Sequence, residues 1–223
     1  KEQTILFLNR RGYAPLNLCR ACGHRLECPN CSAWLVEHKS ISRLQCHHCD
    51  YAITMPSSCS KCSAVDSFHA VGPGVERLEE EVRFRFPAAR ISIASSDTLS
   101  GPVRLSQFIN DVQELKVDII IGTQVIAKGH HFPLVTCVGV IDADLGLAGG
   151  DLRAGERTYQ LLHQVAGRSG RESRPGKVFL QTSQPDHPLI KALLSWDRDG
   201  FLEEEKRGRR DAGMPPFGKL AAV

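Results

Sequence analysis

Eight of the nine cysteines in this chain form four Cys-x-x-Cys pairs near the N-terminus. Two thiolates three positions apart can both reach one tetrahedral zinc ion at about 2.3 Å, because a tight turn directs their sulfurs to a common point. Each pair therefore supplies half of a site, and four pairs predict two bound zinc ions. The pairs are Cys19/Cys22, Cys28/Cys31, Cys46/Cys49 and Cys59/Cys62.

The gaps between the pairs favour a nested arrangement. Five residues separate Cys22 from Cys28, so the first two pairs cannot easily surround one ion. Fourteen residues separate Cys31 from Cys46, which is close to the spacing of zinc ribbons. The two inner pairs are therefore predicted to form one site, which leaves Cys19, Cys22, Cys59 and Cys62 for the other.

A disulfide framework and thiol–disulfide redox chemistry are the alternatives for these pairs. No secretion signal is recognised at the start of the sequence, and this favours metal over disulfides. Cys137 lies in an apolar run and is interpreted as a small buried hydrophobic residue. Four histidines near the pairs could compete as ligands, although eight thiolates already complete two sites: His24, His47, His48 and His69.

Composition indicates a globular chain with a cytoplasmic location. The 223 residues are 42% hydrophobic, which is enough for a proper core, and no apolar run reaches the length of a membrane span. A net charge of +3 is too small to argue for nucleic acid by itself. The sequence starts at Lys1 and ends in an apolar stretch, so it is expected to be a piece of a larger protein.

Apolar runs alternate with amphipathic segments in most of the chain, which predicts an α/β fold with a parallel sheet and crossover helices. Helices are expected where apolar residues recur every three or four positions: from Val75 to Phe86, from Leu105 to Leu115, over about 154–166, and within 187–211. The cysteine block interrupts this pattern after the first strand, so it is interpreted as an insertion. Strands are expected at 4–8, 68–71, 90–94, 117–122, 135–141 and 177–182.

Two glycine-containing turns are candidate anion sites. Gly72 and Gly74 lie between a predicted strand and a predicted helix, where free backbone amides could face a phosphate, although glycine in such a turn can also be simple geometry. A second turn follows the buried strand 117–122, at the end where open α/β sheets bind ligands. It offers a hydroxyl, an amide, a cation and an approachable backbone from Thr123, Gln124, Lys128 and Gly129.

The third candidate is the segment Gln164-Val165-Ala166-Gly167-Arg168-Ser169-Gly170-Arg171 at the end of a predicted helix. Two arginines three positions apart can stabilise the charge that develops on a transferring phosphoryl group. A solvated basic helix end is the alternative. Gln164, Arg168 and Arg171 are therefore the candidate catalytic residues.

Taken together, these segments resemble the C-terminal helicase lobe of the PriA family of replication-restart DNA helicases, which belongs to superfamily 2. The resemblance is carried over nearly the whole chain by Asn9-Arg10-Arg11-Gly12-Tyr13, the four cysteine pairs, GxGxER, GTQxxxKGHHFP, Asp142-Ala143-Asp144 and QVAGRSGR. It implies a RecA-like parallel sheet interrupted by a small module with two zinc ions, and the same nested pairing of the cysteines.

The resemblance also implies a function. The segment from Gly122 to Gly129 is similar to helicase motif V, and Gln164 to Arg171 is similar to motif VI, whose arginines Arg168 and Arg171 reach ATP. Relatives often carry Asp where His131 stands, so a ribose contact there is not expected. The activity implied is ATP- and Mg²⁺-dependent 3′–5′ unwinding of forked DNA with single-stranded regions. The partners implied are single-strand-binding protein, other primosome proteins, an N-terminal helicase lobe and a DNA-binding domain; no membrane is involved.

The sequence contains no G-x-x-x-x-G-K-[ST] segment and no recognisable DExH segment, so this chain alone is expected to lack ATPase activity. The segments implied are 1–15 for the first strand of the lobe, 16–67 for the zinc insert, 68–196 for the rest of the lobe and 197–223 for the start of a C-terminal region. A non-catalytic zinc-ribbon adaptor that docks DNA or protein remains the alternative function.

Overall fold

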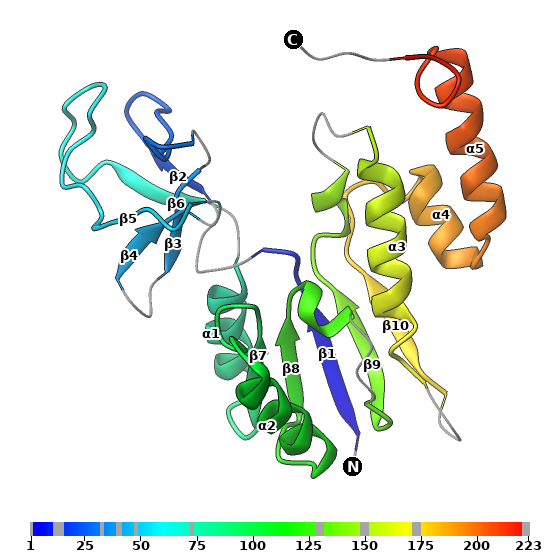
Figure 1. Cartoon of the computed structure of the whole chain (residues 1–223). Coiled ribbons are helices and arrows are strands. Elements are labelled where there is room, and N and C mark those ends of the chain that lie inside the picture. Colours follow the sequence, from blue (N-terminus) through cyan, green and yellow to red (C-terminus); the bar gives the residue numbers. More distant parts are fainter. Residues whose placement is uncertain are drawn as a thin grey trace.

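Five parallel strands form the central sheet of the chain, in the order β10-β9-β1-β8-β7 (Figure 1). A computed structural model gives this arrangement and describes residues 2–10, 16–31, 34–38, 42–46, 49–71, 74–127, 132–147, 152–170 and 175–219. The predicted α/β class with a parallel sheet is confirmed. The strands are β1 (Gln3–Phe7), β7 (Ile91–Ala94), β8 (Ile119–Gly122), β9 (Val135–Val140) and β10 (Lys177–Leu180).

Alternating side chains of the strands enter two different apolar clusters. In β1, Ile5 and Phe7 join the larger cluster, whereas Leu8, which follows the strand, joins the smaller one. In β8, Ile120 joins the larger cluster and Ile121 the smaller one, and both are fully buried. Consecutive side chains of a strand point to opposite faces, so both faces of this sheet carry apolar side chains, as expected for parallel strands.

Helices cover both faces of the sheet. The larger cluster contains residues of α2 (Pro102–Gln113), α3 (Ala154–Ala166), α4 (Pro188–Ser195) and α5 (Arg198–Asp211), so these helices pack on one side. The smaller cluster takes Val75 and Val82 from α1 (Val75–Arg85), which therefore lies on the other side.

The predicted helices are confirmed, with differences at their ends. Tyr159, Leu162 and Val165 are buried on α3, as the apolar period predicted. Phe86 was expected on the inward face of its helix, but it follows the last turn of α1 and is 55% exposed. Leu115 lies just beyond α2 at a φ of 60°, so it also falls outside the helix it was predicted to extend.

The prediction that residues 68–71 belong to the parallel sheet is wrong. They form β6 (Phe68–Val71), which pairs antiparallel with β2 (Leu16–Cys19) in a separate two-stranded sheet. The run contains the polar His69, and such interruption is typical of a strand with one solvated face rather than of a buried parallel strand. Three short strands form another antiparallel sheet: β3 (Val36–His38), β4 (Arg43–Gln45) and β5 (Ala52–Ile53).

We call residues 16–71 the cysteine module. Figure 1 shows it beside the main sheet, beyond α1. Its own apolar cluster is small, with Leu26, Leu35 and Leu44 packed around Cys28 and Cys46. The module contacts the lobe through a hydrogen bond in which His38 Nδ1 lies 3.2 Å from Glu76 Oε1 on α1. The segment limits given above for the chain stay predictions.

The turn that follows α3 requires glycine. Gly170 has a φ of 69°, and a Cβ at this position would overlap the backbone of Gly176. We therefore expect Gly170→Ala to lower the free energy of unfolding by more than about 2 kcal/mol. Gly208→Ala is the matched control, because a Cβ there meets open space inside α5 and should stabilise the protein by about 1 kcal/mol. Thermal and denaturant unfolding of both variants would test the pair, and equal effects would contradict it.

Candidate functional site

The eight paired cysteines gather into two groups of four thiols. Cys19, Cys22, Cys59 and Cys62 form one group, and Cys28, Cys31, Cys46 and Cys49 form the other, with all sulfurs of a group within 4.8 Å of one another. This is the grouping that the spacing predicted.

The sulfur separations fit a tetrahedral metal better than a disulfide. In the outer group the Sγ atoms of Cys19 and Cys62 are 3.6 Å apart, and in the inner group those of Cys28 and Cys49 are 3.4 Å apart. Four sulfurs at about 2.3 Å from one zinc ion would be separated by about 3.8 Å, whereas a disulfide bond is about 2.05 Å long. All nine cysteines lie within the described residues, and none of them forms a disulfide bond. The two groups could therefore bind two zinc ions.

Tight turns with a repeated backbone pattern present the thiols. After the first cysteine of three pairs, the amide of the fourth following residue donates to that cysteine's carbonyl oxygen, at 2.8 or 2.9 Å. This residue has a left-handed φ each time, a conformation that favours glycine and, less strongly, aspartate. The residues are Gly23 at 72°, Asp50 at 59° and Ser63 at 59°.

Nearby polar groups lower the pKa of one thiol and form contacts with two of the neighbouring histidines. A hydrogen bond with the Ser67 hydroxyl, 3.2 Å from Cys19 Sγ, lowers the pKa of the Cys19 thiol to about 6 and so favours the thiolate that zinc binds. His24 contacts Ser60, and His69 contacts Arg20, which supports the interpretation that these histidines are not ligands. His47 and His48 lie outside the described residues.

Elemental analysis would test the metal centres. We expect two zinc ions per chain, and about one ion after Cys59→Ala or Cys46→Ala, because each substitution removes a buried ligand from a different group. Cys137→Ala is the matched control and should retain both ions, since Cys137 belongs to neither group. Metal-free protein with reversible Cys-x-x-Cys oxidation would support the redox alternative instead.

The predicted motif V turn begins at the carboxyl end of β8. Thr123 is buried, and its amide donates to the carbonyl oxygen of Ala94 at the end of β7 (3.1 Å). Gln124 is exposed and starts the 3-10 helix η2 (Gln124–Ala127), which packs against α3. Lys128 and Gly129, also predicted to bind nucleotide or DNA, lie outside the described residues.

The predicted motif VI segment divides into an exposed part and a buried part. Gln164 is exposed on α3 and lines a crevice of about 390 Å³ between α3 and α5. Arg168 was expected to line an open face beside ATP, but only 9% of it is exposed, and its guanidinium donates to the Ala127 carbonyl oxygen at 2.5 Å. Arg171 lies outside the described residues. The contact to ATP predicted for these arginines stays a prediction.

The glycine turn before α1 offers little direct support for a phosphate site. Gly74 is the N-cap residue of α1, and the following amide, from Val75, already donates to the Arg10 carbonyl oxygen at 3.2 Å. This bond joins the start of α1 to the chain leaving β1. Gly72 lies outside the described residues.

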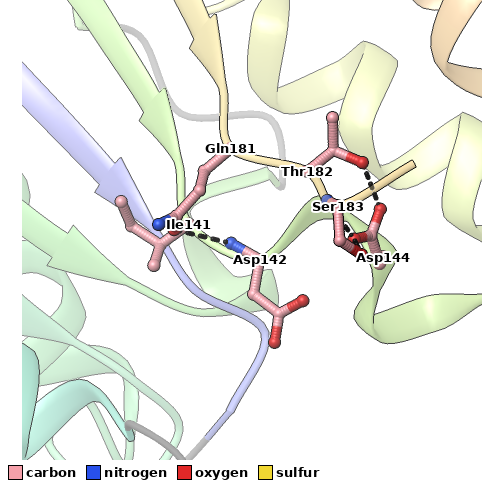
Figure 2. A pocket seen from close by; sticks show the side chains of 6 residues that line it. All are labelled: Ile141, Asp142, Asp144, Gln181, Thr182 and Ser183. Atoms are coloured by element: carbon pink, nitrogen blue, oxygen red, sulfur yellow. Dashed lines mark hydrogen bonds between the residues drawn. The ribbon is translucent and has the colours of Figure 1, made fainter. Parts of the chain in front are cut away.

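Asp142 and Asp144 line a cavity of about 400 Å³ at the carboxyl ends of β9 and β10. Figure 2 shows the two carboxylates pointing in different directions. Asp144 accepts hydrogen bonds from the Ser183 amide (2.7 Å), the Ser183 hydroxyl (2.6 Å) and the Thr182 hydroxyl. Asp142 lies 3.5 Å from Arg10. Each carboxylate therefore contacts residues that follow a neighbouring strand, Arg10 after β1 for Asp142 and Thr182 and Ser183 after β10 for Asp144.

Sequence reasoning gave no role to several residues of this edge. Arg10 belongs to the segment that carried the resemblance, but its pairing with Asp142 was not predicted. Thr182 and Ser183 follow directly after β10, and polar residues at the carboxyl end of a parallel strand are the signal that could have identified them.

The Asp144 carboxyl should titrate at unusually low pH. Burial by itself raises its pKa, but the hydrogen bonds from Ser183 and Thr182 outweigh burial and lower the pKa below its ordinary value. The stabilisation by these bonds is therefore present above the unfolded-state pKa and is lost as the pH falls through the folded-state pKa. We expect Ser183→Ala to raise the pKa of Asp144 in a carboxyl NMR titration.

Ser195→Ala is the control for this titration, because the Ser195 hydroxyl donates to backbone carbonyls of α4 and not to Asp144. An unchanged pKa of Asp144 after Ser183→Ala would show that the hydroxyl does not stabilise the carboxylate.

The fold and the thiol groups define an α/β lobe with an inserted cysteine module of the zinc-ribbon kind, and comparison with known proteins agrees. Residues 28–53 match the family described as "PriA DNA helicase Cys-rich region (CRR) domain". Over all 223 residues the chain is 50% identical to Replication restart protein PriA of Rickettsia conorii and covers 34% of that protein. It is 40% identical to the same protein of Bacillus subtilis over 222 residues, covering 100% of this chain and 28% of the relative.

The resemblance to the PriA family is thus confirmed along the whole chain, which spans about a third of the length of the Rickettsia relative. Among solved structures, the C-terminal domain of the DEAD-box protein Dbp5 aligns with a TM-score of 0.41 and 19% identity, over 56% of this chain and 65% of that one. Within the described residues, no helix combines the length and apolar character needed to cross a bilayer.

Proposed function

We propose that this chain is the second lobe of an ATP-dependent DNA helicase that acts at stalled or abandoned replication forks and starts primosome assembly. The supporting observation is the contact between the ends of η2 and α3, through Arg168 and Ala127. Ala127 directly precedes Lys128 in the sequence, and Arg168 lies three positions before Arg171. The described residues that precede the two candidate phosphate-binding segments are therefore in contact, which supports a shared site.

In this proposal the ATP phosphates bind between this lobe and a first lobe that supplies the phosphate-binding loop and the Mg²⁺ ligands. ATP hydrolysis supplies the free energy for movement along DNA. Arg171 stabilises negative charge on the γ-phosphoryl oxygens. Gln164 helps to position the groups of this lobe that face the cleft between the lobes. Lys128 and Gly129 bind a phosphate of the DNA strand, together with Thr123 and Gln124. Gly72 and Gly74 contribute at the start of α1.

The resemblance to PriA proteins supports the finer parts of the proposal. We infer 3′–5′ movement, recognition of forked DNA with single-stranded regions, and contact with single-strand-binding protein and other primosome proteins. The location inferred is the cytoplasm, close to the nucleoid. Zinc in both thiol groups stabilises the cysteine module, which handles DNA or primosome partners.

A helicase assay on the protein with both lobes would test the proposed role of Arg171. We expect Arg171→Ala to lower DNA-stimulated ATP hydrolysis by about 10³-fold and to abolish unwinding, because the negative charge that develops on the phosphoryl group then lacks its stabilising cation. Zinc content should not change. Arg85→Ala is the matched control, since Arg85 is exposed on α1 and pairs with Glu81. The 223-residue chain alone should hydrolyse no ATP, and normal turnover by the Arg171 variant would refute the role.

A non-catalytic adaptor is the second candidate. It is favoured by Trp34, which is 47% exposed on the cysteine module and lies under the Arg25 guanidinium at 4.7 Å, so it is available for a partner rather than part of the module's core. Adding back a first lobe distinguishes the two candidates, because an adaptor would gain no DNA-dependent ATP hydrolysis.

A further inference from the structure

We propose that Arg168 is a positioning residue, which holds η2 against the end of α3 and does not itself contact the triphosphate. The inference rests on the proposed function and assigns different roles to the two arginines of the motif. Arg168 holds η2 in position, and Arg171 supplies the positive charge that stabilises the γ-phosphoryl group.

The surroundings of Arg168 support this role. The residue is 9% exposed, and its guanidinium donates to the carbonyl oxygen of Ala127, which is itself 3% exposed. A buried guanidinium requires such acceptors, because an unsatisfied buried charge is strongly unfavourable. Arg168 and Ala127 are 41 positions apart in sequence, so the bond joins two segments that no local structure would hold together.

The backbone around Arg168 is anchored in a way that maintains its direction. Its own amide donates to the Val165 carbonyl oxygen at 3.0 Å, which extends the end of α3. The next residue, Ser169, donates from its hydroxyl to the carbonyl oxygens of Thr136 in β9 and Lys177 in β10, at 3.0 and 3.1 Å. The amide of Gly170 then donates to Val135, also at 3.1 Å. The main sheet therefore holds this turn at several consecutive residues.

These contacts fix the position of Arg168. The bond from Arg168 to a buried carbonyl directs its guanidinium into the lobe, toward η2. Arg171 follows Gly170 in the sequence, and the amide of Gly170 is bound to the carbonyl oxygen of Val135 at the start of β9. Lys128 likewise comes directly after Ala127, the residue that Arg168 holds. Loss of Arg168 should therefore disturb the Lys128–Gly129 segment without removing a phosphate ligand.

Hydrogen–deuterium exchange on this 223-residue chain, without nucleotide, tests the proposal directly. We expect Arg168→Ala to speed exchange of the η2 amides by about tenfold or more, because the turn loses a charged hydrogen-bond donor. Arg168→Lys should restore part of the protection, since an ammonium group can donate to one carbonyl but lacks the guanidinium fork. The matched control Arg85→Ala should leave η2 unchanged.

Zinc content and exchange in α1 report whether each variant folds. If Arg168→Ala does not fold, Arg168→Lys decides the matter, with faster exchange at η2 than in the unmodified chain as the expected result. Unchanged η2 exchange in every folded Arg168 variant would overturn the proposal.

Steady-state kinetics of the protein with both lobes provide a second test. A positioning role predicts that Arg168→Lys mainly raises the KM for ATP and the Kd for DNA while kcat falls less than about tenfold. A direct phosphoryl contact predicts instead a fall in kcat like that of Arg171→Ala, and this result would overturn the proposal. If the two-lobe protein has no ATPase activity at all, the proposed function fails, whereas the exchange result still decides whether Arg168 holds η2.

Discussion

The position of β1 in the middle of the sheet constrains the rest of the structure. This strand pairs with β8 on one side and β9 on the other, although more than a hundred residues separate it from either in sequence. The chain leaving β1 must pass through the whole cysteine module before it enters α1. The module is therefore inserted into the lobe at its central strand, and it must return the chain close to the point where it left. The bond between the Val75 amide and the Arg10 carbonyl oxygen marks that return.

The cysteine module has only a small hydrophobic core, and its thiol groups are expected to provide much of its stability through bound metal. Its strands contain two to four residues, and its apolar cluster includes two of the cysteines themselves. Such a unit buries too little apolar surface to offset the loss of chain entropy, so metal binding is expected to contribute much of its folding free energy. The main lobe follows the opposite principle, since it is stabilised by two apolar clusters on either side of a five-stranded sheet.

Patterns that reflect local geometry were predicted well from the sequence. The spacing of the cysteines indicated which pairs meet, because chain length limits which sulfurs can converge, and the apolar period of α3 gave its limits. The assignment of 68–71 failed because a short apolar run does not reveal its partner strand. The direction of Arg168 could not be predicted either, because it depends on a carbonyl oxygen 41 positions away. A motif can show which residue types are present, but tertiary contacts decide which of them face a ligand.

The hydrogen bond between His38 and Glu76 connects the cysteine module to the lobe. His38 ends β3, whose partner β4 leads directly to Cys46 of the inner thiol group. Glu76 lies in the first turn of α1, beside the place where the chain re-enters the lobe. A metal ion bound by the inner thiol group would therefore also support the contact at the start of α1, and its removal by a chelator would weaken the orientation of the module relative to the lobe.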